Sequence, residues 1–332
     1  MAGAPQGGAE LFFERLTAAQ HAAGDAILPL IRCNPARAAR LAAAGLDPVQ
    51  LRFGGPLDPL TRPRLRAALR RFAPQVAVAW MNRAARHAPR GPWVLAGRLG
   101  GYYDLRYYSR CDHLIGNTRG IVDWITGQGW PAARAHHLPN FSPDLAGAAP
   151  AALPTPPGAP VILALGRLHP SKAFDILIRA LPHLPGAHAV IAGDGPERHA
   201  LQSLAAREGV ADRLHFLGWR TDQAALLAAC TVLACPSRHE PLGNVILEAF
   251  SAARPVVAAD AAGPLELIQP GTTGLLVPRE DPRALAEALA QVLSDPALSA
   301  RLVAAGRACY EGAHQPASVL ARWHAALSAM AA

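Results

Sequence analysis

Apolar positions along the chain follow two spacings that alternate through almost the whole sequence. Short continuous apolar runs are typical of buried strands, and apolar residues three or four positions apart are typical of one face of a helix. The runs predict strands at residues 26–31, 49–53, 76–80, 93–96, 113–116, 161–165, 187–192, 214–217, 231–234, 256–259 and 274–277. The helical spacing predicts helices at 9–23, 35–44, 57–72 and 316–330, and others that begin near residues 172, 197, 222, 244, 264 and 282. This alternation indicates an α/β protein with mainly parallel sheets that are covered on both faces.

A proline-rich segment without apolar period, residues 139–160, interrupts this alternation. The length of 332 residues fits two domains of about 150 residues each. We therefore expect two doubly wound, Rossmann-like domains and a C-terminal helix that could pack on either of them. The expected boundaries are 1–145 for the first domain, 146–160 for the linker, 161–315 for the second domain and 316–332 for the helix. Ligands of such sheets bind beyond the carboxyl ends of the strands, so the expected site is a cleft between the domains.

Composition and charge narrow the class of protein. With 51% apolar residues the chain is not mainly disordered, and no apolar run approaches the roughly 18 residues of a membrane-spanning helix. Five scattered cysteines and the lack of a basic and apolar leader indicate a reducing compartment, so we expect a cytoplasmic protein. Residues 1–150 contain 18 Arg and only 9 Asp or Glu, whereas residues 151–332 are nearly neutral.

The basic first half indicates either an anionic partner or a solvated Arg-rich face. The predicted helix at 57–72 carries Arg62, Arg64, Arg66, Arg70 and Arg71. These side chains suit an anionic lipid surface, such as the inner face of the membrane, or a lipid-linked acceptor, and the alternative interpretation is a purely solvated helix. Nucleic acid is not expected, because neither an RNA-binding module nor a recognition-helix motif is visible.

The residues after the strand at 161–165 suggest a site for an anion. Gly166 and Arg167 follow that strand directly, and Lys172, the only lysine of the chain, opens the next helix. Two cations beside a helix N-terminus suit a diphosphate. A surface turn with solvated cations explains the same residues equally well. Farther along, Trp219 is expected to pack in the core rather than to hold a base.

Two acidic residues accompany the strand at 231–234. Glu240 lies in the loop after it, and Glu248 lies about one turn into the helix that follows. Between them, Gly243 and Asn244 offer exposed N–H groups at the start of that helix. Carboxylates suit sugar hydroxyls and N–H groups suit phosphates, so a nucleotide sugar would match both. The alternative interpretation is one capping acid and one solvated acid.

Taken together, these segments resemble the donor domain of the family 4 glycosyltransferases. The matching motifs are Gly166-Arg167 with Lys172, Glu240-x7-Glu248, and Gly263-x-x-Glu266 followed by Gly271-x-x-Gly274, within residues 161–290. Gly7-Gly8 before a helix resembles the amino-terminal glycine loop of the same family. Members are retaining enzymes of the two-domain GT-B fold, so the resemblance implies that fold and that chemistry here.

The resemblance also implies a role for each matching residue. Arg167 and Lys172 would neutralise the leaving diphosphate and Glu240 would contact the transferred sugar, so these three are the expected catalytic residues. The expected donor-binding residues are Gly7, Gly8, Gly166, Leu242, Gly243, Asn244, Val245 and Glu248, the last on the ribose hydroxyls. Neither a cofactor nor a metal is expected, because the cations and a helix dipole can stabilise the leaving group and no Asp-x-Asp motif is present.

The chain departs from the family pattern at two places. Many relatives place a His after the fourth strand of the first domain, but here Asn82 is the nearest polar candidate for a sugar contact, and it cannot act as a base. Only six residues precede Gly7, so the buried first strand of such sheets is expected to be missing, and the natural protein is expected to begin upstream of Met1. Tyr102 and Tyr103 suit contacts with an acceptor sugar, or else pack on the sheet.

The expected function is therefore a retaining, metal-independent glycosyltransferase. It would move a hexosyl group from a nucleoside-diphosphate sugar to a glycan or lipid-linked acceptor in cell-envelope polysaccharide or lipopolysaccharide synthesis. Two alternatives stay open on the same fold: a catalytically silent protein that binds a nucleotide sugar or a partner chain, and a nucleotide-sugar epimerase. A dinucleotide oxidoreductase is disfavoured because Gly193-x-Gly195 lacks the third glycine of that fingerprint.

Overall fold

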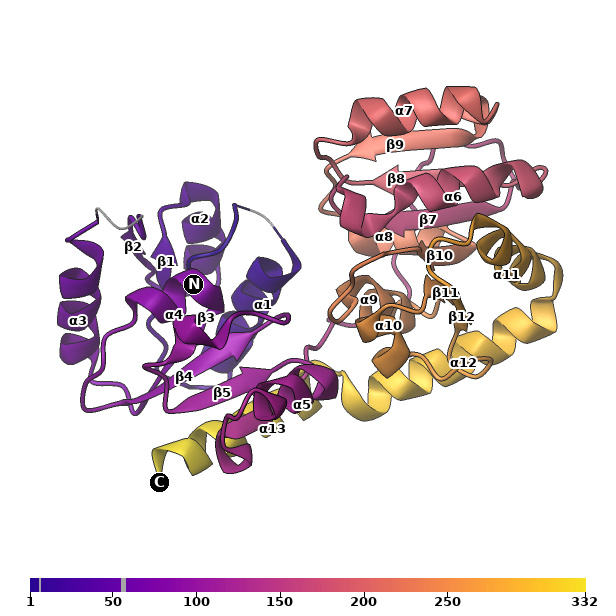
Figure 1. Cartoon of the computed structure of the whole chain (residues 1–332). Helices are drawn as coiled ribbons and strands as arrows, with labels where there is room; N and C mark the ends of the chain where they lie inside the picture. Colours follow the sequence, from indigo (N-terminus) through magenta and orange to yellow (C-terminus); the bar gives the residue numbers. More distant parts are fainter. Residues whose placement is uncertain (6, 55–57) are drawn as a thin grey trace. The chain divides into compact units, whose positions relative to one another are not determined.

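The computed structural model describes residues 1–5, 7–54 and 58–332, which form two compact units (Figure 1). The first unit comprises residues 1–141 and 316–332, and the second comprises residues 142–315. The expected linker at 146–160 belongs to the second unit. Leu145, Ala151 and Leu153 pack against its core, and the N–H of Ala151 donates to the carbonyl of Ala225 at 2.9 Å. This segment therefore runs along the second unit, because its few apolar side chains find a place there.

The second unit is built on one sheet of six parallel strands in the order β12-β11-β10-β7-β8-β9. The strands are β7 (Val161–Leu165), β8 (His188–Ala192), β9 (Leu214–Gly218), β10 (Val232–Cys235), β11 (Val256–Ala259) and β12 (Leu275–Val277). The first of them, β7, lies between β8 and β10, so the chain adds strands on one side and then on the other. In sheets of this order, ligands bind at the carboxyl ends of the two strands where the order reverses. Those strands are β7 and β10.

Helices cover both faces of this sheet, and β7 is buried along its whole length. The α-helices are α6 (Phe174–Ala180), α7 (Arg198–Arg207), α8 (Gln223–Ala229), α9 (Asn244–Ser251), α10 (Ala262–Leu267), α11 (Pro282–Ser294) and α12 (Pro296–Ala313). The 3-10 helices are η3 (Pro170–Lys172), η4 (Leu181–His183) and η5 (Ala211–Arg213). Burial on both faces is the reason that these strands consist of continuous apolar runs.

The first unit contains two parallel sheets instead of one. β1 (Leu30–Arg32) pairs with β2 (Val49–Leu51), and a separate sheet has the order β3-β4-β5-β6. Its strands are β3 (Val76–Trp80), β4 (Val94–Leu99), β5 (His113–Gly116) and β6 (Ala135–His137). The expected strand at 26–31 is thus shortened to Leu30–Arg32. In the described part of the chain no strand precedes α1 (Gly8–Ala22), which agrees with the expected lack of a first strand.

The C-terminal helix α13 (Pro316–Ala331) completes the core of the first unit. Val319, Trp323 and Met330 are buried, and the Trp323 ring stacks on that of Trp80 with centroids 6.2 Å apart. The other helices of this unit are α2 (Pro35–Ala43), α3 (Thr61–Phe72), α4 (Met81–His87), α5 (Arg119–Gly127), η1 (Leu105–Tyr108) and η2 (Ala132–Arg134). Both units are thus parallel α/β structures, as the sequence predicts.

Candidate functional site

The loop after β7 places the only lysine of the chain beside an acidic side chain. Gly166 follows β7 directly, and η3 ends at Lys172. The ammonium of Lys172 donates a hydrogen bond to Oε2 of Glu240, which lies in the loop after β10. The two loops also meet through the backbone, since the N–H of His239 donates to the carbonyl of Ser171 at 3.1 Å. The pair therefore lies at the carboxyl ends of the two strands where the sheet order reverses.

The surroundings of this pair keep its ammonium charged. Burial acts to lower the pKa of Lys172, but the interactions with Glu240 and Cys235 outweigh it, so the pKa of Lys172 is raised. Glu240 is 9% exposed, and its Oε2 also accepts a hydrogen bond from Oγ of Ser237 at 3.2 Å. An ammonium has three N–H donors, of which Glu240 takes one. No described residue hydrogen-bonds Oε1 of Glu240, so both partners keep polar atoms for a ligand.

Helix α9 begins at Asn244, and its N-cap residue, Gly243, lies three residues after Glu240. Gly243 has φ +94°, a left-handed conformation that favours glycine. Asn244 and Val245 form the first turn, whose N–H groups give this end of the helix a partial positive charge. Glu248 lies one turn along and is 5% exposed. The side chain of Leu242 is buried and is therefore closed to a ligand.

Arg167 differs from the other predicted residues of this loop. Its side chain is exposed, and it makes no hydrogen bond or ion pair with any residue that the structure describes. The structure thus joins Lys172 with Glu240 but leaves the Arg167 guanidinium unattached in the same loop.

Two glycines allow the loops of this site to approach other backbone segments. A Cβ on Gly193 would lie 1.7 Å from the carbonyl oxygen of Gly166. A Cβ on Gly263 would lie 2.3 Å from the carbonyl oxygen of Leu242, and the N–H of Gly263 donates to the carbonyl of Glu240 at 2.7 Å. Neither glycine has a positive φ. Close approach, rather than backbone conformation, therefore requires glycine at both positions.

We expect Gly263→Ala to displace the loop that carries Glu240 and Leu242. The new methyl group would overlap backbone atoms, which have little room to move, so the variant should lose about 1–3 kcal/mol of stability. Urea unfolding measures this loss. Gly312→Ala in α12 is the matched control, because its Cβ would meet no atom within 4 Å, and alanine favours a helix. Equal stability of the two variants would contradict the steric argument.

The predicted glycine loop lies in the first unit. Gly7 caps α1 and Gly8 is its first residue. A Cβ on Gly7 would lie 2.4 Å from Oε2 of Glu10. The Glu10 carboxylate is 4% exposed and accepts a hydrogen bond from the N–H of Ala4 at 2.7 Å. Gly7 therefore makes room for an acidic side chain that folds back over the start of the chain.

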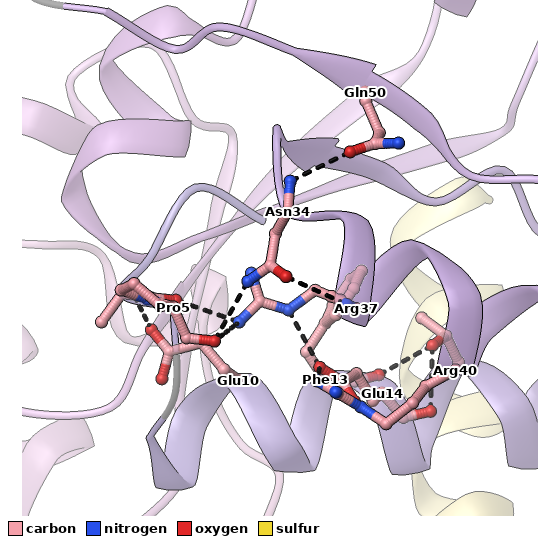
Figure 2. A network of polar contacts seen from close by, with 10 residues as sticks. Pro5, Glu10, Phe13, Glu14, Asn34, Arg37, Arg40 and Gln50 are labelled. Carbon is pink, nitrogen blue, oxygen red and sulfur yellow. Dashed lines mark hydrogen bonds and ion pairs between the residues drawn. The ribbon is translucent and has the colours of Figure 1, made fainter.

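A buried arginine on α2 also holds this segment (Figure 2). Nε of Arg37 donates to Glu14 at 2.9 Å, and Nη2 donates to the carbonyls of Ala4 and Pro5 at 3.0 and 3.2 Å. Nδ2 of Asn34 donates to the carbonyl of Pro5 at 3.1 Å. The segment before the glycine loop is thus fixed by side chains of α2 and of the residue that caps it.

We expect Arg37→Met to lower the free energy of unfolding by about 2–4 kcal/mol. The substitution removes a guanidinium that is 1% exposed and leaves two carbonyls and one carboxylate oxygen without this donor. Arg40→Met is the control, because Arg40 binds the same Glu14 at 2.7 Å but its side chain is 51% exposed. That variant should lose about 1 kcal/mol or less. If urea unfolding shows equal losses, the buried network does not stabilise the unit as described.

Asn82, the predicted sugar contact, has a partner inside the protein. Its Oδ1 accepts a hydrogen bond from the hydroxyl of Tyr108 at 2.9 Å. Burial raises the pKa of Tyr108, so the hydroxyl stays protonated and donates. The residue before Asn82, Met81, has φ +66°, which is uncommon for a residue with a side chain. Asn82 therefore has a structural role that its sequence position does not reveal, and a sugar contact stays a prediction.

The two predicted tyrosines differ in their surroundings. Tyr102 is 47% exposed, and its ring meets that of Trp124 edge to face at 5.9 Å. Tyr103 packs against the core, and its pKa is raised by burial and by the charge of Glu10, which Arg98 opposes. Each tyrosine thus fits one of the two interpretations: the ring of Tyr102 is open to a ligand, and the ring of Tyr103 packs against the core.

The five arginines of α3 are all exposed, whereas Leu65 and Leu69 on the same helix are buried. The pKa of Arg62 is lowered by partial burial and by the charges of Arg110, Arg66 and Arg86. This face of the first unit therefore gathers like charges, and contact with an anionic membrane stays a prediction.

Comparison with known proteins identifies the family. A family model described as "Glycosyl transferases group 1" matches residues 159–295. The lipopolysaccharide core biosynthesis glycosyltransferase LpsE of Rhizobium meliloti (strain 1021) is 35% identical over 308 residues, 90% of this chain and 89% of that protein. The chain belongs to the group 1 glycosyltransferases. LpsD of the same organism, also named a lipopolysaccharide core biosynthesis glycosyltransferase, is 34% identical over 314 residues, 91% of this chain and 89% of that protein.

Solved structures confirm the GT-B fold of this glycosyltransferase. HepE of Anabaena in complex with UDP has a TM-score of 0.84 at 22% identity, over 99% of this chain and 98% of that one. The apo form of the lipopolysaccharide outer core galactosyltransferase WaaB has a TM-score of 0.73 at 17% identity, over 99% and 97%. Within the described residues of the glycosyltransferase, no helix is long and apolar enough to cross a membrane.

The sequence predicts neither the exposure of Trp219 nor the ion pairs of Arg238 in this glycosyltransferase. The prediction that Trp219 packs in the core is wrong, because it is 46% exposed directly after β9. Arg238 pairs with Asp175 at 2.8 Å, pairs with Glu280, and donates to the carbonyl of Pro170 at 2.9 Å, which raises its pKa. It therefore ties the loop after β10 to the loops after β7 and β12.

Proposed function

We propose that this glycosyltransferase moves a sugar from a nucleoside-diphosphate donor to a glycan or lipid-linked acceptor of the lipopolysaccharide core. The observation that carries the proposal is the Lys172–Glu240 pair at the carboxyl ends of β7 and β10, where a doubly wound sheet binds its ligand. Two relatives of 35% and 34% identity are named for lipopolysaccharide core biosynthesis. We place the reaction in the cytoplasm, with the exposed arginines of α3 toward an anionic membrane surface.

In this proposal the second unit binds the donor. The free N–H groups of Lys172 and the guanidinium of Arg167 bind the diphosphate, together with the first turn of α9. Glu248 accepts hydrogen bonds from the ribose hydroxyls. Trp219 offers an exposed ring for stacking on the base. HepE of Anabaena, a similar structure, has been solved with UDP and with UDP-glucose, which makes a UDP-sugar the first donor to test.

The chemical step is a transfer with retention and without a metal. The acceptor hydroxyl attacks the anomeric carbon from the face of the leaving group. The bond from that carbon to the phosphate oxygen breaks, and the phosphate oxygen takes the acceptor proton. Negative charge grows on the departing diphosphate, so cations held in place stabilise the transition state more than the ground state. Glu240 faces the sugar with its unoccupied Oε1, where positive charge grows at the anomeric carbon.

A donor screen followed by product analysis tests the proposal. UDP-, GDP- and ADP-sugars are added to the protein, and the donor that binds raises the unfolding midpoint. That donor is then incubated with lipopolysaccharide core acceptors, with and without EDTA, and the product anomer is determined by NMR. We expect transfer with the donor's configuration and no effect of EDTA. An inverted anomer or loss of activity in EDTA would refute the mechanism. Donor binding without transfer favours a silent binding protein, and conversion of the donor without acceptor favours an epimerase.

A further inference from the structure

Arg238 engages every nitrogen of its guanidinium within the second unit. Nη1 and Nη2 donate to the two carboxylate oxygens of Asp175 at 2.8 Å each, the bidentate geometry that a planar guanidinium favours. Nη1 also donates to the carbonyl of Pro170 at 2.9 Å, and Nη2 donates to Oε2 of Glu280 at 2.9 Å. Nε pairs with Oε1 of Glu280. Because each nitrogen already has a partner, this side chain is suited to joining segments of the protein rather than to binding a ligand.

The loops after β7 and β10 meet in a fixed register beside this side chain. Three successive residues of one loop, 170–172, contact three successive residues of the other, 238–240. Arg238 makes the first contact, backbone atoms make the second, and the Lys172–Glu240 pair is the third. A shift of the first contact would therefore also shift the third, which lies only two residues farther along both loops.

Left-handed backbone conformations accompany the segments that Arg238 holds. Ala173, between η3 and α6, has φ +51°, and Glu280 has φ +63°. This conformation is strained for a residue with a side chain, and such strain persists only where the surroundings hold it. Asp175 lies in the first turn of α6, so Arg238 holds the chain both before and after Ala173. Without these contacts the loop that carries Lys172 could relax.

The charges of this network cancel. Arg238 and Arg179 face the carboxylates of Asp175 and Glu280, and Nη1 of Arg179 donates to Asp175 at 3.0 Å. Burial acts to raise the pKa of Asp175, but the hydrogen bonds and charges of the two arginines outweigh it, so that pKa is lowered and the carboxylate stays ionised. A neutral network attracts an anionic ligand only weakly. Its effect on a reaction at the neighbouring pair should therefore come from geometry.

We propose that Arg238 is a positioning residue for sugar transfer, which fixes the register of the two loops and so the place of Lys172 relative to Glu240. This inference rests on the proposed function, in which that pair meets the donor. A misplacement of about 1 Å can lower a rate by about 10²-fold, because the transition state requires its stabilising groups in place. A flexible ammonium can still follow a bound diphosphate. Loss of the register therefore lowers kcat more than it lowers the affinity for the free nucleoside diphosphate.

A charge-balanced variant of the full chain, Arg238→Gln with Glu280→Gln, tests this role. It removes one cation and one carboxylate, so the network stays neutral while the link between the loops is lost. With the donor that the thermal screen selects, we expect kcat to fall about 10- to 100-fold, and the Kd of its nucleoside diphosphate to change by less than about threefold. The matched control is Arg279→Gln with Asp260→Asn, which removes a 3.1 Å ion pair between the loops after β11 and β12. It should leave both quantities unchanged.

Two further measurements separate positioning from other effects. In a Lys172→Met background the charge-balanced variant should lower kcat by less than about twofold more, because Arg238 acts through that ammonium. Hydrogen exchange at the amide of His239, which donates to the carbonyl of Ser171, should become about tenfold faster without any donor present. If circular dichroism shows that the charge-balanced variant does not fold, Arg238→Lys takes its place, since a lysine keeps the charge but lacks the planar fork.

Four results would overturn the proposal. Unchanged kcat and exchange would show that the register does not depend on Arg238. Equal losses of kcat and of diphosphate affinity would show an effect on donor binding instead. A full further loss in the Lys172→Met background would show that Arg238 acts apart from Lys172. Full activity of Lys172→Met itself would overturn the proposed function as well, whereas a loss in Lys172→Met but not in the charge-balanced variant would overturn the positioning role alone.

Discussion

Lys172→Met is expected to lower kcat/KM for sugar transfer by about 10³-fold. The substitution removes the partly buried ammonium of the loop after β7, whose side chain is 23% exposed, and keeps a side chain of similar length. Charge on the leaving diphosphate would then have only Arg167 and the start of α9 as partners. The affinity for the free nucleoside diphosphate should fall as well, because the same ammonium binds the ground state. Steady-state kinetics with the preferred donor, together with calorimetry of nucleoside-diphosphate binding, measure both effects.

The control for this variant is Arg283→Gln, which removes one positive charge from the same unit at a side chain that is 83% exposed. It should leave kinetics and affinity unchanged. Lys172→Arg separates charge from shape, since a guanidinium keeps the charge but not the compact geometry. We expect Lys172→Arg to retain part of the kcat/KM that Lys172→Met loses. Full activity of Lys172→Met, with a folded protein by circular dichroism, would contradict the assignment of this site.

Glu240→Gln should lower kcat by about 10²-fold while leaving nucleoside-diphosphate affinity unchanged or higher. The amide keeps the shape and can still accept a hydrogen bond from Lys172, but it does not carry the charge that, in our proposal, faces the sugar. Without the carboxylate, the ammonium of Lys172 has no negative partner and attracts the diphosphate more strongly. The two variants should thus differ in diphosphate affinity, which only Lys172→Met lowers, although both lower the rate.

This contrast distinguishes two roles for Glu240. If the carboxylate only positions Lys172, then Glu240→Gln weakens diphosphate binding, as Lys172→Met does. If it contacts the reacting sugar, the loss is confined to kcat. Ser237→Ala is the control, because Ser237 donates to the same Oε2 at 3.2 Å and the variant leaves the charges of Glu240 and Lys172 in place. It should change kcat less than about tenfold.

The sequence predicts best those strands that form one continuous apolar run. The strands at 76–80, 161–165 and 256–259 match to the residue for this reason, and β7 and β11 are buried along their whole length, whereas β3 is only partly buried. The strand at 113–116 also matches, although it begins with a histidine. β6 (Ala135–His137) was not predicted, since three residues with two histidines make no such run. The strand expected at 26–31 is shorter because pairing, rather than apolar character alone, determines strand length.

The sequence predicts those residues of the candidate site that lie in a loop directly after a predicted strand. Lys172 and Glu240 were found in this way, since their loops follow predicted strands. Arg238 was not, because its partners Asp175 and Glu280 lie 63 and 42 positions away, and local spacing does not reveal such pairs. The Tyr108 partner of Asn82, 26 positions away, was missed for the same reason. Trp219 was misjudged because an aromatic residue after a strand is compatible with either core or surface.

The division of the chain affects the order in which its parts fold during translation. Domains usually fold as they leave the ribosome, the amino-terminal one first. Here residues 1–141 lack the helix that buries Val319 and Trp323 against Trp80 until the last seventeen or so residues, 316–332, have been synthesised. The continuous second unit is complete before that point. The amino-terminal half therefore completes its core last, after the second unit has been synthesised.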